Sequence, residues 1–146
     1  MIIIINGPLG IGKTEVSWKL VELFDHAVML DGDYIGAVVP FEIYDAGRIE
    51  YLYQTLRHLV AWHVAHGYND FVINYVFEEP ESLARLRQLL SESSDEIYAF
   101  RLTCSEAQAD QRIRQRAVAT CEDGADLDWE LHRFRELSNI QNETAR

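Results

Sequence analysis

Residues 2–14 read IIIINGPLGIGKT and join a stiff segment directly to a flexible one. The four isoleucines, Ile2–Ile5, are continuous and do not alternate with polar residues, which is typical of a strand buried on both faces of a sheet. The residues that follow include three glycines and a proline, a composition that suits neither a strand nor a helix interior. From Thr14 to Phe24 apolar residues recur at helical spacing. The stretch therefore predicts a strand, a glycine-rich loop and a helix in direct succession.

The loop matches the Walker A pattern G-x-x-x-x-G-K-[ST] between Gly7 and Thr14. Glycines let the backbone curl so that several N–H groups converge, and the start of the helix adds unsatisfied donors and the positive end of its dipole. Lys13 can then reach the β- and γ-phosphates, and the Thr14 hydroxyl can bind Mg²⁺. A chance match is the alternative, but the strand–loop–helix context favours nucleotide binding. The expected phosphate-binding residues are Gly7, Leu9, Gly10, Ile11, Gly12, Lys13, Thr14 and Glu15.

The rest of the chain continues the alternation of strand and helix. Further strands are expected at Ala27–Leu30, Phe71–Phe77 and Ile97–Leu102, and further helices at Arg48–His66, from Pro80 to about Ser91, from Ser105 as N-cap, and from about Trp129. Such alternation implies parallel βαβ units with right-handed crossovers. The sequence predicts a three-layer α/β sandwich, with residues 1–146 forming a single domain.

Charge and composition limit the partners. The formal net charge is −11, a poor electrostatic match to a nucleic acid backbone or an anionic membrane. Cys104 and Cys121 form no CxxC motif and suggest a reducing compartment. Residues 1–5 are too short for a signal-peptide core, and no apolar run has the length of a membrane span. We expect a soluble, cytoplasmic protein that binds neither nucleic acid nor membrane.

Three segments together resemble the P-loop small-molecule kinases: GPLGIGKTE at 7–15, MLDGD at 29–33 and LTCSEAQADQRIRQR at 102–116. This family includes shikimate, gluconate and adenylylsulfate kinases and antibiotic phosphotransferases, and it lies near the nucleoside monophosphate kinases. The resemblance runs from Met1 to about Arg116. It implies strand order 2-3-1-4, an acceptor-binding insertion at about 34–66, a lid at about 105–128, and the use of ATP and Mg²⁺.

Asp31 and Asp33 flank Gly32 at the carboxyl end of a predicted strand, where ligands bind in open α/β sheets. The two aspartates can have different roles, with Asp31 near the metal and Asp33 as the base or orienting group for an acceptor hydroxyl. The alternative is a turn stabilised by aspartate side chains, which is a common use of Asp-Gly.

Arginines supply the remaining candidates. Arg112 and Arg116 are four residues apart on one helix face, and the resemblance implies that they are lid residues that neutralise charge on the transferred group. A solvated basic face is the rival interpretation. Tyr44, Arg48 and Arg57 lie in the insertion where relatives hold the acceptor. An arginine there points to an anionic substrate, while a helix-surface charge is the equally ordinary alternative.

The sequence departs from the family pattern in two places. Relatives often carry an acidic residue at the end of the strand that follows the long helix, where it helps to hold the metal. The predicted strand at Phe71–Phe77 offers Asn74 instead, so Asp31 would have to take over that role. The family's fifth strand and adenine-packing loop should follow the polar stretch, yet the residues after Trp129 have a helical pattern. We therefore expect four strands. Either the given sequence is a piece of a longer chain, or the adenine base is held differently than in the relatives. An open sheet edge favours association, so a homodimer is a further expectation.

These observations predict an ATP-dependent phosphotransferase that moves the γ-phosphoryl group to a hydroxyl or phosphate of a small molecule. Lys13, Asp33, Arg112 and Arg116 are its expected catalytic residues, and Thr14 and Asp31 its metal ligands. A nucleoside or nucleotide kinase is one alternative. Another is a nucleotide-binding module or slow NTPase without a dedicated acceptor, although the absence of an N-K-x-D motif argues against a GTPase switch.

Overall fold

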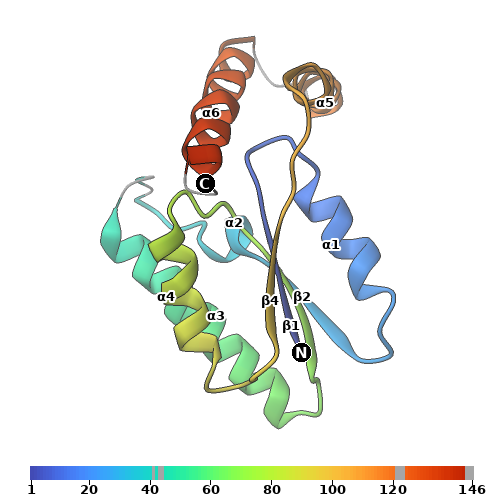
Figure 1. Ribbon diagram of the computed structural model, residues 1–146, viewed down its shortest axis with the longest axis vertical. Coiled ribbons are helices and arrows are strands. Elements are labelled where there is room, and N and C mark those ends of the chain that lie inside the picture. The colour runs from blue at the N-terminus through green and yellow to red at the C-terminus, as the bar shows by residue number, and fades with distance from the viewer. Residues whose placement is uncertain (41, 43–44, 121–123, 144–146) are drawn as a thin grey trace.

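Strands and helices alternate along the chain. The computed structural model describes residues 1–40, 42, 45–120 and 124–143. In chain order its elements are β1 (Ile2–Asn6), α1 (Lys13–Val21), β2 (Ala27–Asp31), α2 (Gly32–Ile35), α3 (Ala46–Ala65), β3 (Asp70–Asn74), α4 (Pro80–Leu90), β4 (Ile97–Arg101), α5 (Glu106–Thr120) and α6 (Gly124–Glu143). Helix α1 covers one face of the sheet, and α3 and α4 cover the other, as Figure 1 shows. The predicted three-layer α/β arrangement is confirmed.

All strand pairs are parallel, and the sheet order is β2-β3-β1-β4. Strand β1 lies between β3 and β4, with Ile4 opposite Ile73 on one side and Ala99 on the other. This is the order 2-3-1-4 that the resemblance implies. Within the described part of the chain the sheet has four strands, because Trp129 and the residues after it continue helix α6.

Two differences from the sequence prediction lie beside the carboxyl ends of the strands. Strand β3 ends at Asn74 rather than at Phe77, because the next residues leave the sheet and bind the side chain of Asn6 through the backbone of Phe77. The short helix α2 follows β2 without a break, and the Asp31 side chain caps it by accepting a hydrogen bond from the Asp33 N–H at 2.9 Å.

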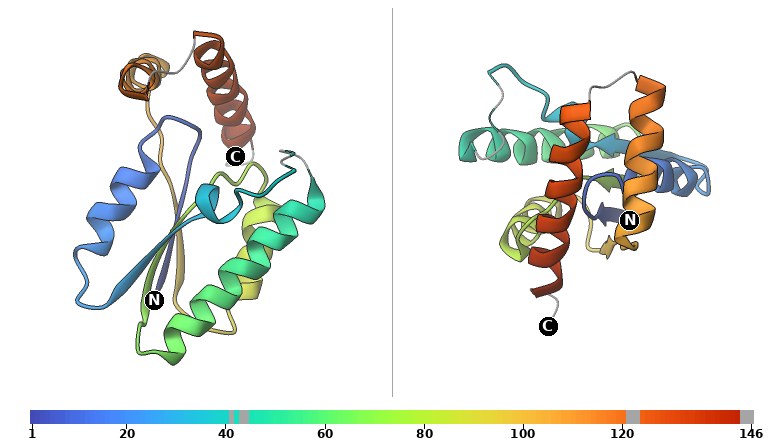
Figure 2. Two further views of the ribbon diagram at one scale, coloured as in Figure 1. Left: turned by 180° about the vertical axis from the view of Figure 1, so that it is seen from behind. Right: turned by 90° about the horizontal axis from the view of Figure 1, so that it is seen from above.

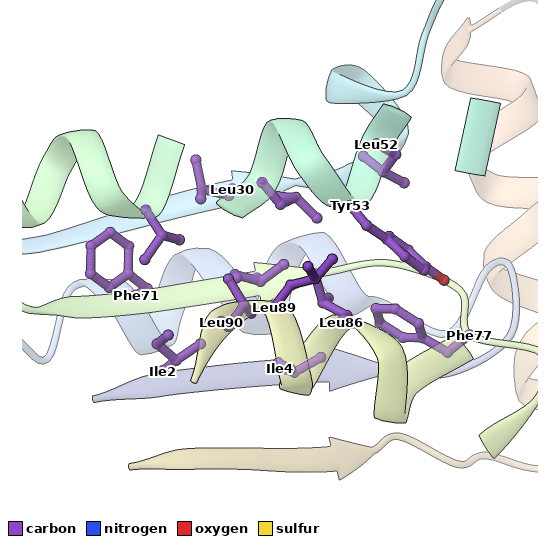
Figure 3. Packing of buried hydrophobic residues seen from close by; sticks show 13 residues of the cluster. Ile2, Ile4, Leu30, Leu52, Tyr53, Phe71, Phe77, Leu86, Leu89 and Leu90 are labelled. Atoms are coloured by element: carbon purple, nitrogen blue, oxygen red, sulfur yellow. The ribbon is translucent and has the colours of Figure 1, made fainter. Parts of the chain in front are cut away.

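The sheet buries apolar side chains on both faces. Ile2 and Ile4 pack with Phe71, Ile73 and the residues of α3 and α4 in the larger cluster (Figure 3). Ile3 and Ile5 point the other way and pack beneath α1. Because successive strand residues point to opposite faces, β1 contributes to both layers. This double burial confirms the interpretation of the isoleucine run and fixes the point from which the glycine-rich loop departs.

Helices α5 and α6 lie side by side beyond the carboxyl ends of the strands, as Figures 1 and 2 show. Ser105 begins α5 with a capping box, since its Oγ accepts from the Gln108 N–H at 3.3 Å and Gln108 Oε1 accepts from the Ser105 N–H at 3.1 Å. Ion pairs between Arg116 and Glu130 and between Arg135 and Glu106 join the two helices. In the described ranges, no helix has both the length and the apolar character needed to cross a bilayer.

Candidate functional site

The glycine-rich loop connects β1 to α1 with a backbone that only glycine adopts readily. Gly10 and Gly12 have φ values of 72° and 97°, in the left-handed region. A Cβ atom at Gly10 would lie 2.5 Å from Cγ1 of Ile113, so α5 packs directly onto the loop. Gly12 occupies the N-cap position of α1, and no side chain caps that helix. The first N–H groups of α1 are therefore available to an anion.

Asn6 holds the start of the loop, a role that the sequence analysis missed. Its buried Oδ1 accepts hydrogen bonds from the Gly7 N–H at 2.7 Å and the Phe77 N–H at 3.0 Å, and its Nδ2 donates to Phe77 O at 3.2 Å. The side chain thus ties the loop to the segment that follows β3. A polar residue that ends an apolar buried strand was the available signal, because such a group needs partners.

Lys13 is buried inside the loop. Its Nζ donates to the carbonyl oxygens of Gly7 at 3.0 Å and Pro8 at 3.1 Å. Burial lowers the pKa of Lys13 to about 8, against a partial opposing effect of Asp33 and Asp31. The ammonium group therefore lacks sufficient negative charge around it, which is a need that bound phosphates would meet.

Asp31 contacts both the loop helix and the short helix α2. Its Oδ2 accepts a hydrogen bond from Thr14 Oγ1 at 3.2 Å, while its Oδ1 caps α2 through the Asp33 N–H. The residue is buried at the carboxyl end of β2. The same Asp31 carboxylate caps the turn into α2 and lies beside the Thr14 hydroxyl, so the geometry is compatible with both interpretations of the Asp-Gly-Asp segment, and the metal-binding role stays a prediction.

The residues next to this contact fit a hard cation. Asn74 is paired in register with Asp31, and alternation along β3 places it on the α1 face with Val72. Its amide is fully buried, and neither polar atom has a hydrogen-bond partner within the ranges described. A hydroxyl, a carboxylate and an orphaned amide oxygen are all ligands that Mg²⁺ accepts, directly or through its waters. Thr14, Asp31 and Asn74 could together hold this ion.

Two cavities open at the carboxyl ends of the strands, and they share lining residues. The phosphate-loop cavity measures about 480 Å³ and is lined by Leu9, Gly10, Gly12, Lys13, Thr14, Glu15, Asp33, Arg112, Gln115 and Arg116. The second cavity measures about 430 Å³ and is lined by Leu9, Asp33, Arg48, Ile49, Tyr53, Tyr75, Val76, Glu78, Glu79, Ser82, Trp129, Arg133 and Leu137. Leu9 and Asp33 line both. Asp33 therefore lies where a group in one cavity would meet a group in the other.

The carboxyl group of Asp33 has an altered environment. Its side chain reaches solvent through the cleft, yet the surrounding protein partly desolvates the carboxylate and raises its pKa. The positive charge of Lys13 opposes this rise, and the negative charge of Asp31 adds to it. A carboxylate with a raised pKa is a better proton acceptor than an ordinary aspartate, which suits a general base.

The two candidate lid arginines lie together over the loop. Arg112 Nη1 donates to Ile11 O at 2.7 Å, and Arg116 pairs with Glu130 of α6. Both line the phosphate-loop cavity, as their shared helix face allows, and their role in catalysis stays a prediction. Arg114 lies on the exposed side of α5, where it pairs with Asp110 at 2.9 Å.

The residues expected to hold an acceptor are separated in the structure. Arg48 lines the second cavity, and its Nε donates to Glu42 O at 2.9 Å. Arg57 is away from both linings and pairs with Glu92, with Nε 3.0 Å from Oε2. Tyr44 lies outside the described residues.

Helix α6 supplies a wall of the second cavity that the sequence analysis did not anticipate. Trp129, Arg133 and Leu137 are spaced four residues apart and lie on one helix face. The spacing was visible in the sequence. Which surface that face would cover depends on how α6 docks, and no local pattern specifies that.

Comparison with known proteins agrees with this geometry. A family model described as "AAA domain" matches residues 2–137, nearly the whole chain. The chain belongs to this AAA-domain family. A search of curated protein sequences finds no significant match.

Solved structures of P-loop kinase type share the fold of this AAA-domain protein. A chain of the Pnkp1/Rnl/Hen1 RNA repair complex superposes with a TM-score of 0.72 at 14% identity, over 97% of this chain and 45% of that one. The tunicamycin resistance protein of Deinococcus radiodurans gives 0.59 at 18% identity, over 97% and 94%. Shikimate kinase from Acinetobacter baumannii, in complex with shikimate, gives 0.56 at 19% identity, over 98% and 76%. At these identities the likeness establishes the fold.

Proposed function

We propose that the protein is an ATP-dependent phosphotransferase that moves the γ-phosphoryl group to a hydroxyl or phosphate of a small molecule. One observation carries the proposal: a second cavity shares two lining residues, Asp33 and Leu9, with the phosphate-loop cavity. A module that only binds or slowly hydrolyses nucleotide needs no such second chamber. The kinase fold of the solved structures described above supports the same conclusion.

The loop residues would bind the nucleotide mainly through positive charge. The uncapped N–H groups at the start of α1 and the loop amides would hold the phosphate oxygens. The Lys13 ammonium would exchange its bonds to Gly7 O and Pro8 O for phosphate oxygens. Arg112 and Arg116 would stabilise the charge that develops on the transferred group, as cationic lid residues do in phosphoryl transfer.

Asp33 would act on the acceptor. From the junction of the cavities it would accept a hydrogen bond from the attacking hydroxyl, orient its lone pair and take its proton. Thr14, Asp31 and Asn74 would hold Mg²⁺, which when bound neutralises charge on the β- and γ-phosphate oxygens. Most of the acceleration would come from positioning and electrostatics, because the transition state of phosphoryl transfer is loose.

ATP turnover with and without acceptors tests the proposal. We expect ADP formation in the presence of Mg²⁺ to increase when a panel of small hydroxyl and phosphate compounds is added. Lys13→Ala should weaken ATP binding and abolish turnover while the fold stays intact. Arg57→Ala is the matched control, because Arg57 lies outside both cavities. Hydrolysis that no acceptor stimulates would instead favour a simple NTPase.

A further inference from the structure

The second cavity has aromatic and aliphatic walls. Tyr53 of α3, Tyr75 after β3 and Trp129 of α6 line it, together with the aliphatic side chains Leu9, Ile49, Val76 and Leu137. Tyr53 is almost fully buried, its hydroxyl is hydrogen-bonded to Ser82, and burial raises its pKa to about 12. Tyr53 therefore keeps its proton at any physiological pH. Walls of this kind bind ligands that have a flat or apolar face.

The charges that line the cavity are predominantly negative. Asp33, Glu78 and Glu79 supply three carboxylates, against two guanidinium groups from Arg48 and Arg133, which leaves one net negative charge among the described lining residues. Asp33 and Glu79 are the exposed carboxylates of this set, and so they are accessible to a ligand.

Both arginines of the lining already bind other groups of the protein. Arg133 is buried and pairs with two carboxylates, Glu78 beside it in the cavity and Glu136 on α6, the latter at 3.1 Å. Arg48 is also buried, and its Nε binds the Glu42 carbonyl oxygen at 2.9 Å. An anionic ligand would compete with Glu78 and Glu136 for Arg133, and it would bring a negative charge close to Asp33 and Glu79.

We infer that the acceptor carries no negative charge: it is an uncharged or cationic hydroxyl compound with an aromatic or apolar face. This inference rests on the proposed phosphoryl transfer. The sequence left open whether arginines in the insertion bind an anionic substrate or are ordinary helix-surface charges. Arg57 lies outside both cavities, and Arg48 donates from Nε to the Glu42 carbonyl oxygen.

The reaction of such an acceptor balances without any further reagent. The hydroxyl oxygen forms a bond to the γ-phosphorus as the bond from that phosphorus to the β–γ bridging oxygen breaks. The electron pair of the broken bond leaves with ADP, and the hydroxyl proton passes to the Asp33 carboxylate and then to solvent.

Matched pairs of acceptors test the inference. 5′-O-methyluridine and uridine 5′-monophosphate share a base and the 2′- and 3′-hydroxyls, while phenyllactamide and phenyllactate share an aromatic ring and a secondary hydroxyl; within each pair only the second compound is anionic. We expect kcat/KM for the non-anionic member to exceed that of its partner by at least about tenfold, because like charges are strongly unfavourable in a partly desolvated site. Faster transfer to the anionic members would overturn the inference and leave the proposed function standing. ATP hydrolysis without transfer to any member would overturn both.

Two variants test whether the preference for non-anionic acceptors arises in this cavity. Glu79→Gln removes an exposed lining carboxylate and should reduce the discrimination within each pair severalfold, whereas Glu81→Gln, an exposed carboxylate of α4 outside the lining, should not. Trp129→Ala should raise the acceptor KM at least about tenfold while the KM for ATP stays unchanged. Trp62→Ala, which removes an equally exposed tryptophan of α3, is its control. Unchanged discrimination in Glu79→Gln together with an unchanged acceptor KM in Trp129→Ala would place the acceptor elsewhere.

Discussion

Because the ammonium group of Lys13 is buried, we expect nucleotide binding to be coupled to the uptake of a proton. In the free protein the pKa of Lys13 is about 8, because burial outweighs the nearby carboxylates. Phosphate oxygens would restore the missing negative charge and raise this pKa towards or beyond that of an ordinary lysine. Between about pH 8 and 10 the free protein would hold Lys13 mostly neutral and the complex would hold it charged, so binding takes up a proton.

We therefore expect an uptake of about half a proton per ATP at pH 8, and almost none at pH 6.5. Titration calorimetry in two buffers with different ionisation enthalpies measures this number directly. Lys13→Arg is the control, since a guanidinium stays charged across the whole range and should show no uptake. Equal binding enthalpies in both buffers at pH 8 would mean that the Lys13 pKa does not change on binding.

The effect of replacing Asp33 distinguishes a kinase from a protein that only binds nucleotide. Asp33→Asn keeps the shape of the side chain but removes its charge and its ability to accept a proton. Phosphoryl transfer should fall by about 10²–10⁴-fold, nearer the lower end because loose transition states need little base assistance, while ATP affinity stays nearly constant. Asp31→Asn should behave differently and weaken the Mg²⁺ dependence, because Asp31 contacts Thr14. Quenched-flow rates at several Mg²⁺ concentrations distinguish the two. If Asp33→Asn retained the full rate of phosphoryl transfer, Asp33 would have only a structural role in the turn.

Helix α5, which carries Arg112, contacts the glycine-rich loop at Gly10. Gly10 and Gly67 both have positive φ, but only Gly10 is crowded: a Cβ there would lie 2.5 Å from Ile113, and a Cβ at Gly67 would meet nothing within 4 Å. Alanine at either position introduces backbone strain of about 1 kcal/mol. At Gly10 the side chain of Ile113 on α5 must also shift.

Gly10→Ala should therefore weaken ATP binding by at least about tenfold and lower the melting temperature, because the loop and Arg112 lose their positions. Gly67→Ala should lower the melting temperature slightly and leave ATP binding unchanged. Thermal unfolding and ATP titration of both variants measure the two effects separately. Equal ATP affinities in the two variants would show that the contact of α5 with the loop does not matter for binding.

Local patterns predicted most of the elements, and interactions between distant segments explain the rest. The continuous isoleucines of β1 and the helical spacing of α1 are properties of adjacent residues. The structure confirms the buried strand and the helix, but α1 ends at Val21, and Leu23 lies beyond it and is exposed. The end of β3 could not be predicted in the same way, because it depends on hydrogen bonds between Phe77 and Asn6, which are 71 residues apart. The wall that α6 contributes to the second cavity likewise depends on docking.

At the scale of the whole molecule, the layered fold followed from the alternation of elements, and the strand order followed from the resemblance to P-loop kinases. Most of the glycine-rich motif lines the phosphate-loop cavity, and because the motif is continuous in sequence its residues could be named in advance, while their binding roles stay predictions. The acceptor half draws on α3, α4, α6 and the segment after β3. Of its lining, Asp33 and Arg48 were singled out from the sequence as candidate acceptor residues and Leu9 as a phosphate-loop residue. Each of the others has an ordinary structural explanation when it is read alone.

Strand β4 leaves part of the sheet uncovered. Tyr98 and Phe100 are paired in register with Ile3 and Ile5, which places them on the α1 face, yet they remain 48% and 54% exposed. Helix α1 lies mainly over β2 and β3, and no described strand pairs with the outer edge of β4. An unpaired edge beside two exposed aromatic rings is a favourable surface for association.

We expect residues 1–146, as a purified chain, to form a homodimer through this edge at micromolar concentration. Sedimentation velocity over a concentration series would measure the dissociation constant. Phe100→Lys should shift the protein towards monomer by at least about tenfold in that constant, because a charge beside the strand must be desolvated when the edge is paired. Trp62→Lys changes a comparably exposed aromatic residue on α3 and should leave the dimer intact. A monomer at all concentrations, or a dimer that Phe100→Lys does not weaken, would show that the β4 edge stays unpaired in this chain.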